Sequence, residues 1–320
     1  MPTSTTDAPG AGASQRRPLG ASSPRYGERI IKAFLALCAG LSVVVTIAIV
    51  ISLVSPTIGF FQKVPITEFL FGTKWSPGFG EQSSYGVLPT VVATLDIVVV
   101  SLLVAVPVGL LSAFYLSEYA HPRVRRVVKP MLEVLGGIPT VAIGLFALMF
   151  LRPLAAKWVP FLEWDTPFSF GVAGVAVGLM VVPLVSSVSE DAMRSVPRGL
   201  REGAYALGAS KMRVSVRVVF PAAISGIVAA IVLATSRAIG ETMVVLIAAG
   251  STPAMVPPWD VTESVQTMTA FIGSTATGDI ATGSITYNTI FAVGTLLFVM
   301  TLCMNMLAMR LVRRFREVYE

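Results

Sequence analysis

The sequence predicts an all-α polytopic membrane protein with six transmembrane helices. Of its 320 residues, 54% are hydrophobic and 13% are charged, and the mean hydropathy is +0.76. Soluble domains have about 25% charged residues, so the composition disfavours a soluble enzyme, a disordered protein and a nucleic-acid-binding domain. Six long runs are nearly free of charge, and about 20 apolar residues suffice to cross a bilayer core as a helix. Such continuous runs also exclude a transmembrane barrel, whose strands alternate in polarity.

The runs predict six spans in chain order: 33–55, 87–116, 131–151, 169–188, 219–249 and 285–309. Residues 1–29 are rich in Ser, Thr, Pro, Gly and Ala, and we expect them to form a disordered cytoplasmic tail. The apolar run behind this tail is too long for a signal peptide and has no suitable cleavage site, so we expect the first span to stay attached. Residues 30–320 then form a six-span membrane domain.

The basic residues predict the orientation of the spans. One side would hold the tail, the second loop, the fourth loop and the C-terminal end, with most of the Lys and Arg: Arg16, Arg17, Arg25, Arg29, Lys32, Arg123, Arg125, Arg126, Lys129, Arg194, Arg198, Arg201, Lys211, Arg213, Arg217, Arg310, Arg313, Arg314 and Arg316. The other side would hold Lys63, Lys74, Arg152 and Lys157. The positive-inside rule therefore places both termini in the cytoplasm of a multi-pass protein.

Two charged residues, Arg237 and Glu241, fall inside the fifth expected span. Arg237 lies 16 residues after Pro221, or about 24 Å along a helix, which is deep in the membrane. In a continuous helix their i, i+4 spacing puts both side chains on one face. Either they form a self-neutralising pair that only stabilises the helix bundle, or they form a polar site on a solute pathway. The hydroxyls of Thr235, Ser236 and Thr242 would contribute to such a site.

An arginine fork suits a tetrahedral oxyanion, because it donates two parallel hydrogen bonds. Glu241 would repel a fully ionised oxyanion, but it could accept a hydrogen bond from the P–OH group of hydrogen phosphate, which sulfate lacks. The chain has one histidine, His121, and two scattered cysteines, Cys38 and Cys303. We therefore expect no metal site, no cofactor and no catalytic constellation.

Two further carboxylates lie at or within the expected spans. We expect Asp96 to lie near the external interface of the second span or to be hydrogen-bonded to a neighbour, and Glu133 to form an interfacial ion pair with Lys129. Pro107, Pro139 and Pro183 fall inside spans two, three and four, where they are expected to kink the helices.

The fourth loop, residues 189–218, is expected to contain a short helix outside the bilayer. Pro197 is placed to open this helix and Gly208 to end it. The same pattern of residues is also typical of an ordinary basic helix that lies at the membrane interface. The stretch from Gly203 to Lys211 is not a nucleotide-binding loop, because Ala209 stands where the lysine is required. If ATP energises this protein, the ATPase is another chain.

The loop resembles the EAA loop of ABC-importer permeases, whose pattern is E-A-A-x3-G-x9-I-x-L-P. Glu202, Ala204, Gly208 and Pro221 match this pattern, whereas Gly203, Val218 and Phe220 are conservative departures. The resemblance implies a coupling helix that docks on a cytoplasmic ATPase through Glu202, Gly203, Ala204, Tyr205 and Gly208.

More narrowly, the chain is similar to C-type permease subunits of phosphate-specific ABC importers. Three segments carry the similarity: Trp75–Pro77 with Tyr85–Thr90, Leu135–Thr140, and Ser236–Thr242. The resemblance implies a type I ABC-importer permease fold in the plasma membrane. It also implies partners: an A-type second permease, two ATPase subunits that hydrolyse ATP, and an extracytoplasmic phosphate-binding protein. Inorganic phosphate would be the transported solute, and membrane lipid would surround the protein. No nucleic acid partner is expected.

Three alternatives remain at this point. The chain could be a permease for sulfate or molybdate, a passive anion channel, or a membrane enzyme acting on a lipid phosphate. The absence of a catalytic constellation argues against the enzyme, and the EAA-like loop argues against the passive channel.

Overall fold

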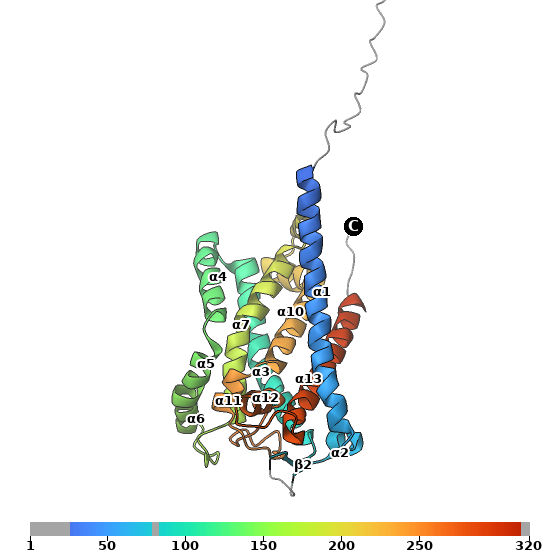
Figure 1. Ribbon diagram of the computed structural model, residues 1–320. Helices are drawn as coiled ribbons and strands as arrows, with labels where there is room; N and C mark the ends of the chain where they lie inside the picture. The colour runs from blue at the N-terminus through green and yellow to red at the C-terminus, as the bar shows by residue number, and fades with distance from the viewer. Residues whose placement is uncertain (1–25, 79–82, 315–320) are drawn as a thin grey trace, which may run out of the picture. The chain divides into compact units, whose positions relative to one another are not determined.

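The computed structural model describes residues 26–78 and 83–314, and the chain divides into two units, residues 1–51 and 52–320. The α-helices are α1 (Tyr26–Phe61), α2 (Ile66–Phe71), α3 (Leu88–Phe114), α4 (Pro122–Gly136), α5 (Thr140–Phe146), α6 (Arg152–Trp158), α7 (Phe170–Arg194), α8 (Arg198–Ala206), α9 (Lys211–Val214), α10 (Phe220–Ile239), α11 (Met243–Ala248), α12 (Met268–Ala276) and α13 (Ile285–Arg314) (Figure 1). Three π-helical turns continue them: η2 (Tyr115–Tyr119), η3 (Ala147–Leu151) and η4 (Ser215–Val219).

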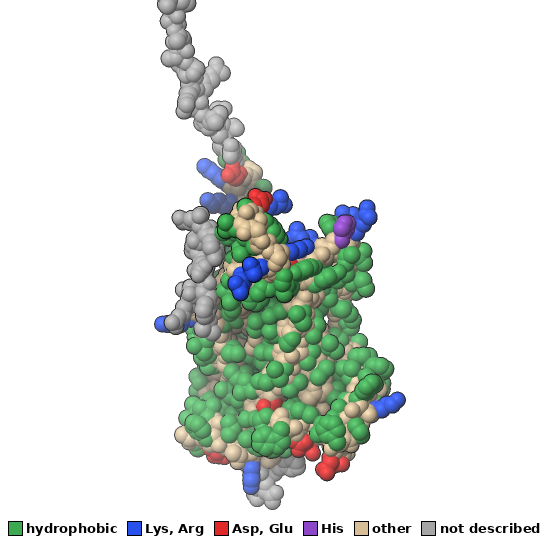
Figure 2. Space-filling model, turned by 180° about the vertical axis from the view of Figure 1, so that it is seen from behind, with side chains coloured by type: hydrophobic (Ala, Val, Ile, Leu, Met, Phe, Trp, Pro, Cys, Tyr) green, Lys and Arg blue, Asp and Glu red, His purple; other side chains and the backbone are tan. Residues whose placement is uncertain are grey.

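The predicted six-span helical fold is confirmed. Within the described ranges, six helical segments are long and apolar enough to cross a membrane: Tyr26–Phe61, Leu88–Tyr119, Thr140–Trp158, Phe170–Arg194, Lys211–Ile239 and Ile285–Arg310. Hydrophobic side chains cover most of the face of the second unit that is in view in Figure 2.

The first helix begins at Tyr26, earlier than the predicted start at residue 33. Residues 1–25 of the expected tail lie outside the described residues, and the last four, 26–29, are helical. The residues before the apolar run include Glu, Arg and Lys, which are good helix formers, so the helix extends past its apolar part.

The chain between α1 and α3 is held by a cluster of aromatic side chains. Strands β1 (Trp75–Ser76) and β2 (Ser84–Tyr85) pair antiparallel, with Trp75 opposite Tyr85. The ring of Phe69 lies edge-on to that of Phe60 at 5.4 Å, and the ring of Trp75 meets Phe271 of α12 at 4.8 Å. These buried rings fix the loop against the ends of α1 and α12.

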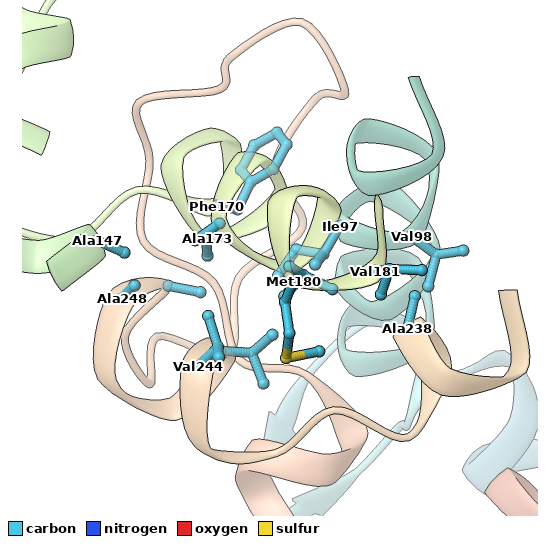
Figure 3. Close-up of a cluster of buried hydrophobic side chains, with 14 of the residues drawn as sticks. Ile97, Val98, Ala147, Phe170, Ala173, Met180, Val181, Ala238, Val244 and Ala248 are labelled. Atoms are coloured by element: carbon cyan, nitrogen blue, oxygen red, sulfur yellow. The ribbon is translucent and has the colours of Figure 1, made fainter. Parts of the chain in front are cut away.

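Helices α3 and α7 form the closely packed centre of the second unit. A Cβ atom added at Gly178 of α7 would lie 2.7 Å from the carbonyl oxygen of Ser101 on α3, and one at Gly174 would lie 2.6 Å from Val100 Cγ1. Glycine at these positions is therefore what allows the two backbones to approach. Buried side chains of α10 and α11 complete this core (Figure 3).

The third span was predicted with the wrong bounds. The expected span was 131–151, but the helix breaks after Gly136 and the apolar segment runs from Thr140 to Trp158. Pro139 cannot donate to the helical ladder, and it disfavours the helical conformation in the residue before it. Residues up to Gly136 instead belong to α4, which turns Arg125 and Lys129 towards α7 and leaves most of its apolar side chains exposed.

Candidate functional site

The fifth span is interrupted at the candidate solute site. Helix α10 ends at Ile239, and α11 begins at Met243 after a break formed by Gly240, Glu241 and Thr242. The sequence predicted one continuous helix over 219–249. That prediction was wrong, and because Glu241 lies outside α10, helical spacing does not put it on one face with Arg237. Gly240 has no side chain to stabilise helical backbone, and it occupies the C-terminal cap of α10.

The carboxylate of Glu241 holds the break together. Its Oε1 accepts hydrogen bonds from the backbone N–H groups of Met243 at 3.1 Å and Val244 at 3.2 Å, which are the first donors of α11. Its backbone oxygen accepts a hydrogen bond from Thr269 Oγ1 at 2.6 Å. The residue is 9% exposed. Glu241 therefore satisfies helix donors that would otherwise be unpaired inside the span.

Arg237 is left without a partner in the described part of the chain. It lies in the last turn of α10 and is exposed, and its side chain makes no hydrogen bond or ion pair with another described residue. The ion pairs of the described residues instead join α4 to α7 and α8 to η2. An unpaired guanidinium within a span is costly unless it faces water or a ligand. The structure therefore does not show the ion pair between Arg237 and Glu241 that a purely self-neutralising role would require.

The three predicted hydroxyls, those of Thr235, Ser236 and Thr242, donate to groups other than Arg237 in the described chain. Thr235 is buried on another face of α10, and its Oγ1 donates to the carbonyl oxygen of Ile231 at 2.8 Å. Thr242 Oγ1 donates to the carbonyl oxygen of Gly240 at 3.4 Å, within the break. These two hydroxyls support the local backbone.

Ser236 is hydrogen-bonded to Asn305, a polar residue that was not predicted to belong to the site. Its Oγ donates to Asn305 Oδ1 at 2.6 Å and so joins α10 to α13 next to Arg237. The available signal was an amide within the largely apolar stretch 290–309, because an amide in such a stretch requires a partner.

The predicted short helix in the fourth loop is present as α8. Pro197 precedes its first residue, and Gly208 follows its end with φ of +78°, a conformation that favours glycine. Glu202, Gly203 and Tyr205 are exposed, and Leu207 at the tip is 90% exposed, whereas Ala204 is half-buried against the protein. The outer face of α8 is thus open to a partner.

The inner face of α8 carries an ion pair that the sequence did not suggest. Arg201 Nη1 lies 2.8 Å from Oε1 of Glu118, whose side chain is 3% exposed in η2. These residues are 83 positions apart, so no local spacing pointed to their contact.

The expected pair of Glu133 with Lys129 was wrong. Glu133 is exposed, and Lys129 Nζ instead bonds Asp191 at 2.8 Å and lies 3.5 Å from the fully buried Glu190, which also bonds Arg125. Burial alone would lower the pKa of Lys129, but the hydrogen bond to Asp191 and the charge of Glu190 outweigh it and raise that pKa. Lys129 therefore stays charged at physiological pH, and its contribution is lost only as the pH rises through the raised pKa.

Asp96 lies half-buried on α3 without a hydrogen-bond or ion-pair partner among the described residues. We assign it no role.

Comparison with known proteins gives consistent matches. Residues 105–317 match the family described as "Binding-protein-dependent transport system inner membrane component". The chain is 33% identical over 266 residues to the "Probable ABC transporter permease protein YqgH" of Bacillus subtilis (strain 168), covering 82% of this chain and 84% of that protein. It is also 33% identical over 277 residues to the "Phosphate transport system permease protein PstC 1" of Mycobacterium tuberculosis (strain ATCC 25618 / H37Rv), covering 77% and 82%.

The fold itself has solved counterparts. A chain of a bacterial alginate ABC transporter, crystallised with its alginate pentasaccharide-bound periplasmic protein, matches with a TM-score of 0.61 at 17% identity, covering 93% of this chain and all of that one. This likeness concerns the fold, which is that of ABC-importer permeases. Because the family match covers most of the sequence, the chain belongs to the family of binding-protein-dependent transport system inner membrane components.

Proposed function

We propose that this chain is the C-type permease subunit of an ABC importer that moves inorganic phosphate into the cell. The unpaired guanidinium of Arg237 at the broken end of α10 is the observation that carries the proposal. A desolvated oxyanion needs a compensating cation and donors, and this side chain has all its donors free of described partners. The relative named as a phosphate permease supports phosphate as the solute.

Glu241 has a structural role in addition to the one expected from the sequence. Its Oε1 is committed to the backbone of α11, so it fixes the geometry of the break next to Arg237. Its Oε2 accepts no hydrogen bond from the described residues, which leaves it available to the P–OH group of hydrogen phosphate. Sulfate offers no such donor, and this difference favours phosphate.

The proposed assembly contains this chain, an A-type permease, two ATPase subunits and an extracytoplasmic phosphate-binding protein. ATP is hydrolysed on the ATPase chains, and this chain is a non-catalytic transport subunit without a cofactor. The exposed outer face of α8 supports docking of an ATPase through Glu202, Gly203, Tyr205 and Gly208, with the small Ala204 half-buried beneath them.

The proposal is tested by ATP-driven uptake of radiolabelled phosphate, sulfate and molybdate into vesicles that hold the reconstituted assembly and binding protein. We expect phosphate uptake that requires ATP and is not reduced by excess sulfate. Preferred uptake of sulfate or molybdate would identify another oxyanion permease, and uptake without ATP would identify a passive channel. Turnover of lipid phosphate by the purified chain would support the enzyme instead.

We further propose that both termini lie in the cytoplasm, with α8 on the same side. In a variant lacking both native cysteines (Cys38→Ser, Cys303→Ser), single cysteines at Phe161 or Trp259 should react with an impermeant maleimide in intact cells. These side chains are 82% and 80% exposed in segments expected outside. A cysteine at Leu207 should react only after permeabilisation. Labelling at Leu207 in intact cells would contradict both the orientation and the ATPase-docking role.

A further inference from the structure

The carboxylate of Glu118 accepts hydrogen bonds from side chains of two other helical segments. Arg201 Nη1 of α8 donates to both of its oxygens, at 2.8 and 3.0 Å, and Ser215 Oγ of η4 lies 3.2 Å from Oε2. Glu118 itself sits in η2, which continues α3. Hydrogen bonds to a buried charge are among the strongest in proteins, and losing one partner leaves the other uncompensated.

Arg201 also bonds a third segment. Its Nη2 donates to the carbonyl oxygen of Met193 at 2.8 Å, near the end of α7. One guanidinium therefore joins α8 to α7 and to η2, the continuation of α3, and α3 and α7 are the two helices whose glycine contacts pack them closely. Through Ser215, the same carboxylate reaches η4, which leads directly into α10 and Arg237.

Besides the Arg201 ion pair, α8 is held by the packing of Leu200 and Ala204 against a buried cluster that includes Met193 and Val214. None of its nine residues, all of which the structure describes, is fully buried, and Leu200 and Ala204 are only half-buried. Arg201 faces inward, whereas its neighbour Glu202 is exposed. The same turn of α8 thus presents an outer face to a partner and an inner face fixed by charge to the membrane helices.

We propose that the Glu118–Arg201 pair transmits displacement of α8 to α3, α7 and α10, so that both are positioning residues for alternating access. This proposal rests on the proposed function, in which α8 is the helix that the ATPase moves. The pair does not contact the solute. Breaking the pair is therefore expected to weaken the coupling of ATP hydrolysis to transport, and to leave the assembly and the solute preference unchanged.

The first test compares the wild-type assembly with Glu118→Gln and Arg201→Gln in vesicles. We expect the ATPase to co-purify with each variant, and the ATP hydrolysed per phosphate imported to rise at least tenfold. The double variant should be no worse than Arg201→Gln, because that single variant already breaks the contact with Glu118 as well as the bond to Met193. Arg201→Lys, which keeps the charge but loses the fork, should give an intermediate ratio.

Asp191→Asn is the matched control. It removes the carboxylate of another ion pair at the same end of the molecule, that with Lys129, and should leave the ratio within twofold of wild type. An unchanged ratio in Glu118→Gln would overturn the proposal. So would loss of ATPase co-purification in Glu118→Gln and Arg201→Lys, because the pair would then serve only assembly.

A second readout does not depend on the solute. In a background that lacks the exposed native cysteines (Cys38→Ser, Cys303→Ser), spin labels at Arg198→Cys on α8 and Leu111→Cys on α3 should keep one distance with and without ATP, because the two helices move together. Glu118→Gln should broaden that distance on ATP binding, and an unbroadened distance would overturn the proposal. If the assembly imports no phosphate, the proposed solute fails, while this distance still decides the role of the pair.

Discussion

Replacing Arg237 with alanine is expected to lower ATP-driven phosphate uptake by about a hundredfold while the protein remains in the membrane. The guanidinium is exposed and unpaired within the described chain, so its removal breaks no internal contact that the fold needs. A bidentate charge-assisted pair with an oxyanion contributes about 3 kcal/mol, which corresponds to about a hundredfold. Initial uptake rates in vesicles, at matched protein content, measure the effect.

Two variants bracket this result. Leu233→Ala changes an exposed side chain one turn earlier on the same face of α10, and it should leave uptake within twofold of wild type. Arg237→Lys keeps the charge but loses the fork, so partial uptake is expected at most. Near-normal uptake by Arg237→Ala would exclude Arg237 from the solute pathway.

The double variant Arg237→Ala/Glu241→Ala separates the two readings of the polar pair. If the two charges only neutralised each other, removing both would restore transport. Because Glu241 instead caps α11, the double variant should remain inactive. Glu241→Gln retains a side-chain oxygen for this cap, so it should keep the break intact and slow uptake less than Glu241→Ala. Recovery of transport in the double variant would support a purely structural pair.

Contacts between distant residues limited what the sequence could predict. Long charge-free runs identified the six spans, because bilayer thickness sets the length of apolar helix required. The short helix after Pro197 was also predictable, since proline and Gly208 act locally. The break at Gly240 was missed because helical spacing was extended through a glycine that ends α10. The Glu118–Arg201 contact depends on how α3 and α8 pack, which no local pattern encodes.

The second large effect concerns α8. The double variant Glu202→Lys/Gly208→Val should lose the ATPase on purification and bring phosphate uptake to background. Glu202 is exposed on the outer face, so the substitution reverses a charge where the partner would dock. Gly208 has φ of +78°, which a β-branched residue adopts only with strain, so valine would distort the end of α8. Co-purification of the ATPase and uptake in vesicles are the two measurements.

Glu133→Lys serves as the control, because it makes the same charge reversal at an exposed residue of α4, away from α8. It should retain both the ATPase and the uptake. The membrane fold of the double variant should also persist, because a Cβ atom at Gly208 meets no other atom within 4 Å and the core between α3 and α7 lies elsewhere. A double variant that keeps the ATPase and transports normally would refute docking through α8. Loss of the ATPase from both variants would instead point to a general effect of added positive charge.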